Sequence, residues 1–548
     1  MTEANSKTLI LGFDALDFRY LDRFQGSLPH FRALRNRGLE APLDSTFPPW
    51  TASAWPSMYT GMDPSYHGVY DFFTIGGYPD KAQLVTNRDV EQPAIWDYLT
   101  AQGARSIVLN VPVTHPAGEL NGVLIPGYLA SEDATGYPAT IRDEVSNAVG
   151  EPYRIYSRNE AESGTVQVSD YTDLIDLRKQ AAIHLLESRE WDFSFIQVQK
   201  TDNVFHSFDD ESAFRRVYEA ADELLGAVLD TVSDDVNVIV CSDHGMGRKN
   251  GYGIYLNEIL REHGYIEIGT GGTGPQLKHV KRRFKQSEST DSENRPLPAT
   301  AVTWFVEEFG EHLPIGSLYT VLENLGIADS VSKMVPYTSR AAASDGIDWA
   351  KSTAYCRSSS RLGVRINLRN RDPQGVVPES DYERVRDDII ALLTGVKTPD
   401  GRDAFEDVSR REAVYDGPYS ERADDILVTP KGMNNGIGTE LFGRQFISID
   451  TYDHKPAGVF LADGPAFEAD TSLGRLSLTD VAPTAMAVLK QPVPDRMTGT
   501  VPNGLLTRSI ETAQYDDLTI DFAGREGTER GAEKEKTMEE RLENLGYL

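Results

Sequence analysis

Short apolar runs of strand length recur along the first half of the chain and alternate with longer amphipathic stretches. Such short runs are typical of strands buried on both faces, whereas apolar residues recurring every three to four positions indicate helices. The alternation predicts an α/β fold: a doubly wound, mainly parallel central sheet with helices on both faces. The strand-like runs are KTLILGF at 7–13 and the segments 106–112, 193–199 and 236–245; the helical stretches are 28–38, 172–189 and 212–231.

The regular alternation stops near residue 266, where a glycine-rich segment leads into the basic run KHVKRRFK at 278–285. A strand pattern returns with LGVRINL at 362–368. We interpret the basic run as a solvated helix face or loop, with contact to an anionic substrate as the alternative. The expected organisation is a core formed by 1–257 and 351–507, an inserted lid at 258–350 and an acidic helical tail at 508–548.

The chain is strongly acidic, with 84 Asp and Glu against 54 Lys and Arg and a net charge of −30. Only 16 of the basic residues are Lys, and 38 are Arg. An acid excess with scarce Lys indicates adaptation to molar salt, where screening removes most self-repulsion; the alternative is an acidic enzyme without that adaptation. With either explanation, the negative electrostatic field of the protein disfavours broad binding of nucleic acid.

Two cysteines, Cys241 and Cys356, are too few for a disulfide framework, and their apolar contexts indicate buried thiols. The N-terminal segment lacks the basic start and apolar core of a signal peptide. Nowhere do about 18 apolar residues run together, so no membrane span is expected. These features predict a cytoplasmic protein and leave its oligomeric state open.

Acidic and imidazole side chains follow several of the strand-like runs. In a doubly wound sheet the carboxyl ends of the strands form the ligand crevice, so we expect these side chains to converge at one edge. Singly, each has an ordinary explanation, such as a capping acid for Asp14 or a hydrogen-bonded structural imidazole for His206. The combination carries the prediction. Its members are Asp14, Asp202, His206, Asp243, His244 and His454.

The six residues divide into two sets of three metal ligands. Asp and neutral His suit zinc, and open catalytic zinc sites commonly use three protein ligands. Two ions about 3.5–4 Å apart can clamp the attacking and leaving oxygens of an in-line displacement, and manganese is the alternative metal. One set is Asp202, His206 and His454, and the other is Asp14, Asp243 and His244.

A candidate nucleophile, Thr51, follows two prolines and a tryptophan and opens the helix-like run ASAWPSMYTG. A hydroxyl at a helix N-terminus has backbone N–H groups nearby and a dipole that favours an anion. A metal ion would lower its pKa and hold it as an alkoxide. The local sequence alone favours the alternative that Thr51 is a plain N-cap.

Together these residues resemble the alkaline phosphatase superfamily, most closely its type I phosphodiesterase/nucleotide pyrophosphatase branch. The resemblance covers roughly 7–265 and 350–505 and leaves the lid and the tail unmatched. Its motifs here are Asp14 after the first strand, Thr51 nine residues before Thr60-Gly61, PSYHG at 64–68, the D-x-x-x-H pair Asp202 and His206, DHGM at 243–246, His454 in DHKPAG, and LTDVAPTAMAVLKQPVPDRMTG at 478–499.

The resemblance implies an alkaline-phosphatase-like fold and a two-metal phosphoric ester hydrolase acting on a small phosphate ester. It implies that Thr51 is both a metal ligand and the nucleophile, forming a phosphothreonine that water then hydrolyses with overall retention at phosphorus. The metals it implies are two divalent ions, zinc with manganese as the alternative.

In one respect the chain departs from the branch. Members of the branch carry an Asn shortly after the H-G pair that contacts a phosphoryl oxygen. At the same spacing this chain has Phe72, and Asn110 in LNVPVTHP is another asparagine that could make this contact. This leaves nucleotide substrates open beside other mono- and diesters. We interpret His67 as structural. The arginines of RINLRNRDPQG are expected in surface ion pairs, with a substrate pocket as the alternative: Arg365, Arg369 and Arg371.

Other functions of the superfamily are a phosphomonoesterase, a sulfatase and a phosphotransferase such as a cofactor-independent phosphoglycerate mutase. Thr51 disfavours the last two, because a sulfatase requires Cys or Ser in a C/S-x-P-x-R context and the mutase uses Ser. From a different class, a non-catalytic scaffold that retains the fold is the remaining alternative. The complete ligand sets disfavour it.

Overall fold

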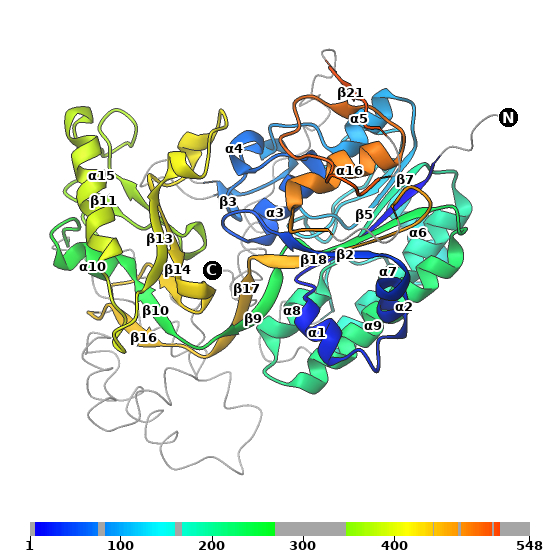
Figure 1. Ribbon diagram of the computed structural model, residues 1–548, viewed down its shortest axis with the longest axis horizontal. Helices are drawn as coiled ribbons and strands as arrows, with labels where there is room; N and C mark the ends of the chain where they lie inside the picture. The colour runs from blue at the N-terminus through cyan, green and yellow to red at the C-terminus, as the bar shows by residue number, and fades with distance from the viewer. Residues whose placement is uncertain are drawn as a thin grey trace, which may run out of the picture.

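The computed structural model of the chain describes residues 6–74, 83–158, 167–268, 347–441, 443–468, 473–506 and 509–515. Figure 1 shows these residues as two bodies. The larger holds an eight-stranded sheet, and the smaller, which we call the second lobe, holds the described strands between residues 252 and 448. An antiparallel ribbon of β9 (Gly245–Lys249) and β17 (Thr451–Lys455) runs from one body to the other.

The eight-stranded sheet is mainly parallel, with β18 running antiparallel to both its neighbours. The strands predicted from the four apolar runs are its centre and one flank, which confirms the predicted α/β class. In spatial order the strands are β19 (Leu476–Ser477), β2 (Leu39–Asp44), β18 (Ala457–Asp463), β8 (Asn237–Cys241), β1 (Thr8–Phe13), β7 (Phe193–Val198), β5 (Ser106–Leu109) and β6 (Gly122–Ile125).

Strand β1 shows why a continuous apolar run marks the middle of this sheet. All six of its residues are buried. Leu9 and Leu11 pack into the hydrophobic cluster on one face, whereas Ile10 packs into the cluster on the other. A strand that is covered on both faces needs apolar residues at odd and even positions alike. Strands of parallel sheets are usually covered in this way.

Helices cover both faces of the sheet, as predicted. The residues of α2, α6, α7, α8 and α9 contribute to one hydrophobic cluster and those of α3, α5 and α16 to the other (Figure 1). These helices are α2 (Pro29–Arg37), α3 (Thr51–Thr60), α5 (Ile95–Ala101), α6 (Ile141–Val149), α7 (Val168–Ser188), α8 (Lys200–Ser207), α9 (Glu211–Thr231) and α16 (Val481–Val488).

The second lobe has its own small sheets. One joins β10 to β15 and β16, and the other has the order β11-β12-β14-β13. The strand predicted at 362–368 forms β12, which pairs with β11 and β14 and not with the central sheet. The lobe also contains α10 (Leu256–Glu262) and α15 (Glu379–Thr394). Its strands are β10 (Tyr252–Tyr255), β11 (Ala354–Tyr355), β12 (Gly363–Ile366), β13 (Phe405–Arg410), β14 (Ile426–Pro430), β15 (Gly436–Gly438) and β16 (Phe446–Ser448).

The sheets divide the chain differently from the expected boundaries. Segment 351–507 is expected in the core, but its strands up to residue 448 pair within the small sheets of the second lobe. Periodicity reveals a strand without revealing which sheet it joins, so the sequence could not make this distinction. Residues 269–346 of the expected lid, including the basic run 278–285, and the tail from 516 lie outside the described residues.

Both cysteines are buried free thiols, as predicted for Cys241 and Cys356. Among the described helices, none combines the length with the apolar character that crossing a membrane requires.

Candidate metal centre

The carboxyl ends of three adjacent strands bring the candidate ligands together. Strand β1 lies between β7 and β8 in the central sheet. Asp14 directly follows β1, and Asp243 and His244 follow β8. Helix α8, which begins two residues after β7, carries Asp202 and His206. The sixth residue, His454, arrives on β17 from the ribbon that leads to the second lobe.

Thr51 is the first residue of α3, a helix whose ten residues are all buried. The preceding residue, Trp50, is extended (φ −116°, ψ 141°) and makes no side-chain cap. The Thr51 hydroxyl therefore lies within the first turn and is not the N-cap. Its Oγ1 lies 3.4 Å from Asp14 Oδ1, to which it can donate, and 3.5 Å from His244 Nε2.

Asp14, Asp243 and His244 form a compact donor set beside this hydroxyl. His244 Nε2 lies 3.5 Å from Asp14 Oδ1 and 3.2 Å from Asp243 Oδ2, and all three side chains are fully buried. Asp243 Oδ2 is buried and accepts no hydrogen bond from the described residues. A buried carboxylate oxygen of this kind is suited to be a metal ligand.

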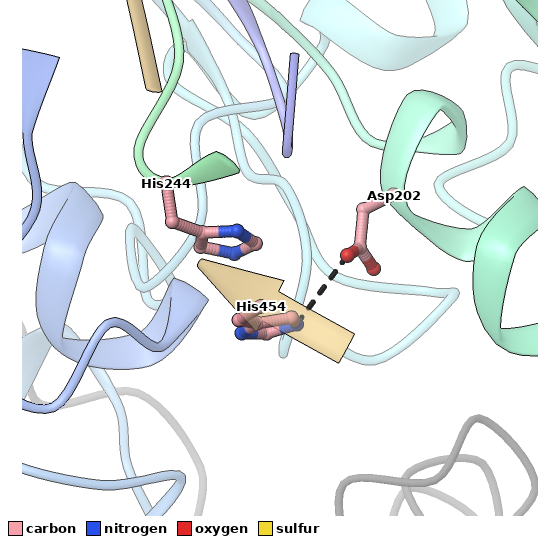
Figure 2. Close-up of side chains that lie close together, drawn as sticks. All are labelled: Asp202, His244 and His454. Carbon is pink, nitrogen blue, oxygen red and sulfur yellow. Dashed lines mark ion pairs between the residues drawn. The ribbon is translucent and has the colours of Figure 1, made fainter. Parts of the chain in front are cut away.

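A second donor set adjoins the first. His206 Nε2 lies 3.2 Å from Asp202 Oδ1 and 3.2 Å from His454 Nε2. His454 Nε2 in turn lies 3.4 Å from Asp202 Oδ1, the contact dashed in Figure 2. The His244 and His454 rings stack with centroids 3.8 Å apart (Figure 2), so the two sets share a boundary. The structure thus brings together all seven residues predicted for the site.

Backbone contacts set the tautomers of two of the histidines. His454 Nδ1 lies 2.9 Å from the Pro49 carbonyl oxygen, and His244 Nδ1 lies 3.1 Å from the Gly245 carbonyl oxygen. A carbonyl only accepts, so each Nδ1 carries the proton and each neutral ring presents the Nε2 lone pair to the centre. Metal-bound histidines are commonly oriented in this way.

The two carboxylates beside Thr51 are held by groups that the sequence did not single out. Asp14 Oδ2 accepts from Trp55 Nε1 at 3.0 Å and from Gln197 Nε2 at 3.1 Å, which leaves Oδ1 toward Thr51. Asp243 Oδ1 accepts from the Ala15 backbone N–H at 3.2 Å. A signal was present in the sequence, since a glutamine inside the apolar run FSFIQV requires a polar partner.

Because these carboxylates are buried, their negative charges are poorly stabilised by the protein alone. Desolvation and the neighbouring carboxylates raise the pKa of Asp14 well above its ordinary value, and desolvation also raises that of Asp243. Desolvation opposes ionisation of Asp202 too, but His206 and His454 outweigh it and hold its pKa well below the ordinary value. Within the described residues, the only basic side chain within 4.0 Å of the Asp14 and Asp243 carboxylates is that of His244, and burial holds its pKa well below the ordinary value, so it brings no positive charge. Divalent cations would supply the missing positive charge.

The donor atoms fit such cations in spacing as well as in type. Ligand atoms about 2.0–2.1 Å from a tetrahedral zinc ion lie roughly 3.4 Å from one another. The separations from His244 Nε2 to the Asp14 and Asp243 oxygens, and those among Asp202, His206 and His454, span 3.2 to 3.5 Å. Both sets therefore fit a divalent metal ion.

Three further residues have structural surroundings. His67 is fully buried, its Nε2 lies 2.8 Å from Ser57 Oγ, and burial lowers its pKa to about 3. These contacts agree with the structural role expected for it. Phe72 lies in the hydrophobic core. Asn110 is also buried, and its Nδ2 donates to Gln197 Oε1 at 2.9 Å, which places it behind Gln197.

Of the three arginines, two form buried rather than surface contacts, so that expectation is wrong for them. Arg365 donates to Asp372 at 3.0 Å, and Arg371 donates to Asp425 at 2.6 Å, with both carboxylates almost fully buried. Arg365 on β12 thus pairs with the segment that follows this strand, and Arg371 in that segment pairs with Asp425, the residue before β14. Arg369 donates to the Val376 carbonyl at an exposed position.

The solved structures of one hydrolase share this alkaline-phosphatase-like fold. Phosphonoacetate hydrolase from Sinorhizobium meliloti 1021, in complexes with phosphonoformate and with phosphonoacetate, superposes with a TM-score of 0.55 at 15% sequence identity, covering 88% of this chain and 96% of the hydrolase. Murine ectonucleotide pyrophosphatase / phosphodiesterase 5, an inactive form in complex with AMP, is 14% identical with a TM-score of 0.48, covering 89% of this chain and 96% of that one.

The family model for type I phosphodiesterase / nucleotide pyrophosphatase matches residues 8–299, more than half of the chain. The chain therefore belongs to this family, which confirms the predicted resemblance and indicates a phosphoester hydrolase. No curated protein matches the chain in a sequence comparison.

Proposed function

We propose that the chain is a two-metal phosphoric ester hydrolase whose nucleophile is Thr51 Oγ1. The observation that carries the proposal is the position of this hydroxyl, within 3.5 Å of both Asp14 Oδ1 and His244 Nε2. A hydroxyl at that distance from two ligands of one set can enter the same coordination sphere. The family supports phosphoester chemistry.

One cation would be held by Asp14, Asp243, His244 and Thr51, and the other by Asp202, His206 and His454. Bound there, divalent cations would neutralise the buried carboxylates, lower the pKa of the nucleophilic hydroxyl and stabilise charge on the phosphoryl group. Zinc suits the mixed Asp and His donors, with manganese as the alternative.

The protein's own part in the reaction begins with the position of Thr51. The first turn of α3 places Oγ1 at the positive end of the helix dipole, which favours the anionic form. Its hydrogen bond to Asp14 Oδ1 orients the hydroxyl proton away from the attacking lone pair. Attack at phosphorus forms a phosphothreonine, which still carries the second ester group when the substrate is a diester, and expels the alcohol, which takes up the proton that Thr51 loses. Attack by water then releases phosphate from a monoester or a phosphate monoester from a diester, and a proton of that water restores the Thr51 hydroxyl.

The substrate class we propose is a small phosphate mono- or diester. The test is a panel of p-nitrophenyl phosphate, bis(p-nitrophenyl) phosphate, p-nitrophenyl sulfate and phosphonoacetate. Phosphonoacetate is included because a structure of similar fold holds it. Hydrolysis of a phosphate ester faster than the sulfate ester supports the proposal, whereas faster sulfate hydrolysis refutes it in favour of a sulfatase.

Thr51→Ala and Thr51→Ser test the nucleophile. We expect Thr51→Ala to lose at least about a thousandfold in kcat while retaining two metal ions, since a covalent route is removed. Thr51→Ser should keep part of the activity. Thr60→Ala, at the other end of α3, is the matched control, because among the described residues the Thr60 hydroxyl donates only to the Pro56 carbonyl within the helix. Phosphate found on Thr51 by mass spectrometry after an acid quench would identify the intermediate.

A further inference from the structure

Two buried amide groups at the start of α8 present nitrogens without partners. Gln199 is 4% exposed and Asn203 is fully buried. Neither Gln199 Nε2 nor Asn203 Nδ2 has a hydrogen-bond partner in the described part of the chain. Leaving a buried donor unsatisfied is unfavourable, so the pair indicates an acceptor that the described residues do not supply.

The orientation of the Gln199 amide follows from a chain of contacts that starts at Trp55. An indole N–H only donates, so Asp14 Oδ2 is an acceptor. Gln197 must therefore direct its Nε2 to this oxygen, and the same Nε2 donates to Gln199 Oε1 at 2.9 Å. The Gln199 oxygen is thus engaged, and its NH₂ group is the end that remains.

A lysine sets the second amide in the same way. Lys200 Nζ donates to Asn203 Oδ1 at 2.8 Å, and an ammonium group cannot accept. Asn203 must present its oxygen to Lys200 and its Nδ2 elsewhere. Both amides are thus oriented with their NH₂ groups unpaired by the described residues, and the buried Lys200 ammonium lies beside one of them. Such a group of donors is suited to bind an anionic oxygen.

The spacing of these residues directs them toward the metal ligands. Gln199, Asn203 and His206 are separated by four and three positions, and Asp202 is four before His206. Residues at such spacings share one face of a helix. Gln199 is also joined to Asp14 through the single side chain of Gln197. The amides therefore border the donor sets from the β7 end.

We propose that the Gln199 and Asn203 amides form a donor subsite that binds a phosphoryl oxygen of the substrate. This inference rests on the proposed function, because it is the phosphoryl group at Thr51 that would bring the oxygen. Neutral amides bind the oxygen without adding charge to the metal centre. In this scheme Gln197 is a positioning residue that orients both Asp14 and Gln199.

Acidic variants separate this role from a purely structural one. Gln199→Glu and Asn203→Asp keep the oxygens that Gln197 and Lys200 require, but replace each unpartnered NH₂ with a carboxylate oxygen. A structural role predicts that both variants bind phosphate like the wild type. The donor role predicts at least about tenfold weaker binding in each, since a hydrogen bond to an anion is lost. Gln199→Met, which removes the donor without adding charge, should also weaken binding by about tenfold.

The measurement is calorimetric binding of inorganic phosphate to the zinc-loaded full chain at fixed salt, with metal content and Tm recorded for every variant. Gln180→Glu is the charge control, because it adds the same charge at an exposed position of α7. Phosphate binding weakened in Gln199→Met and Asn203→Asp, with metal content unchanged, supports the subsite. Binding within about twofold of the wild type in both variants overturns it.

The inference and the proposed function can fail separately. A wild-type protein that binds phosphate but hydrolyses none of the esters refutes the proposed function, and the variants still decide the subsite through phosphate affinity. A zinc-loaded wild type that hydrolyses phosphate esters but shows no phosphate binding up to millimolar concentration overturns the subsite alone.

Discussion

His454 Nδ1 donates a hydrogen bond to the backbone carbonyl of Pro49 at 2.9 Å. Pro49 lies two residues before Thr51, so this contact joins a candidate metal ligand to the entry of the nucleophile's helix. The Trp50 ring packs on the same imidazole with centroids 4.6 Å apart. A shift of β17 would therefore move the ligand and disturb the approach to Thr51 together, which makes the ribbon between the two bodies part of the geometry of the site.

The first prediction concerns removal of metal. Asp14 and Asp243 are fully buried and burial raises their pKa values, so the cation-free protein must protonate or hydrate them at a cost to stability. Chelation should abolish hydrolysis and lower Tm, and zinc or manganese should restore both. Each ion at one hundred times its dissociation constant contributes about 2.7 kcal/mol. Differential scanning calorimetry with and without chelator measures the effect.

Thr51→Ala is the control for the chelation experiment, because it removes the nucleophile and leaves six protein ligands. Its Tm should rise on metal addition nearly as much as that of the wild type, although it does not turn over substrate. A Tm that is insensitive to both metals and chelator would contradict the assignment of the two donor sets.

The second prediction concerns His454. Replacement by Gln should remove one ligand and the hydrogen bond to Pro49, so metal analysis should show about one ion per chain where the wild type holds two. Activity should fall at least about a hundredfold, as it does when partners of metal ligands are lost. His263→Gln, on the exposed end of α10, is the matched control and should match the wild type in both measurements. Two ions retained in His454→Gln would remove this residue from the ligand set.

The third prediction concerns Gly12, in the strand that delivers Asp14. A Cβ at this position would lie 2.5 Å from Trp55 Cη2. Gly12→Ala should therefore destabilise folding by about 1–3 kcal/mol, as overpacked cores do. Because Trp55 also holds Asp14, metal affinity should fall too. Gly26→Ala, where an added Cβ meets nothing within 4 Å, should leave both urea stability and metal affinity unchanged.

Much of the fold could be predicted from the sequence because the central strands are buried on both faces. Leu9, Ile10 and Leu11 need apolar surroundings whichever way they point, and a run of that kind is visible without coordinates. The convergence of the candidate ligands could also be predicted from the sequence, since strand ends in a parallel sheet share one edge. The assignment of β12 to a separate sheet was not, because strand partners depend on contacts between distant segments.

The contacts that orient the site show the same limit. Trp55 reads as a core residue in ASAWPSMYTG, and nothing local indicates that its indole N–H meets Asp14 Oδ2. The orientation of the Gln199 amide depends on Asp14 just after β1, Gln197 in β7 and Trp55 in α3. Arg365 and Arg371 were expected at the surface because charged residues usually lie there, but buried Asp372 and Asp425 supply partners that the sequence does not reveal.

The last prediction uses His67 as a probe of acid sensitivity. Burial lowers its pKa from 6.5 to about 3 in the folded chain. Between those values the unfolded chain binds one more proton than the folded chain at this residue, so lowering the pH through that window favours unfolding. The effect is about 1.4 kcal/mol per pH unit, and reaches about 4–5 kcal/mol near pH 3. His67→Gln keeps a donor for Ser57 and an acceptor for the Val69 N–H but does not titrate. Urea unfolding of both proteins at pH 8, 6, 5 and 4 should show the variant gaining stability relative to the wild type as pH falls. The metal-ligating histidines titrate in both and cancel in the difference, so a difference that stays constant with pH would mean that the buried imidazole accepts a proton without penalty.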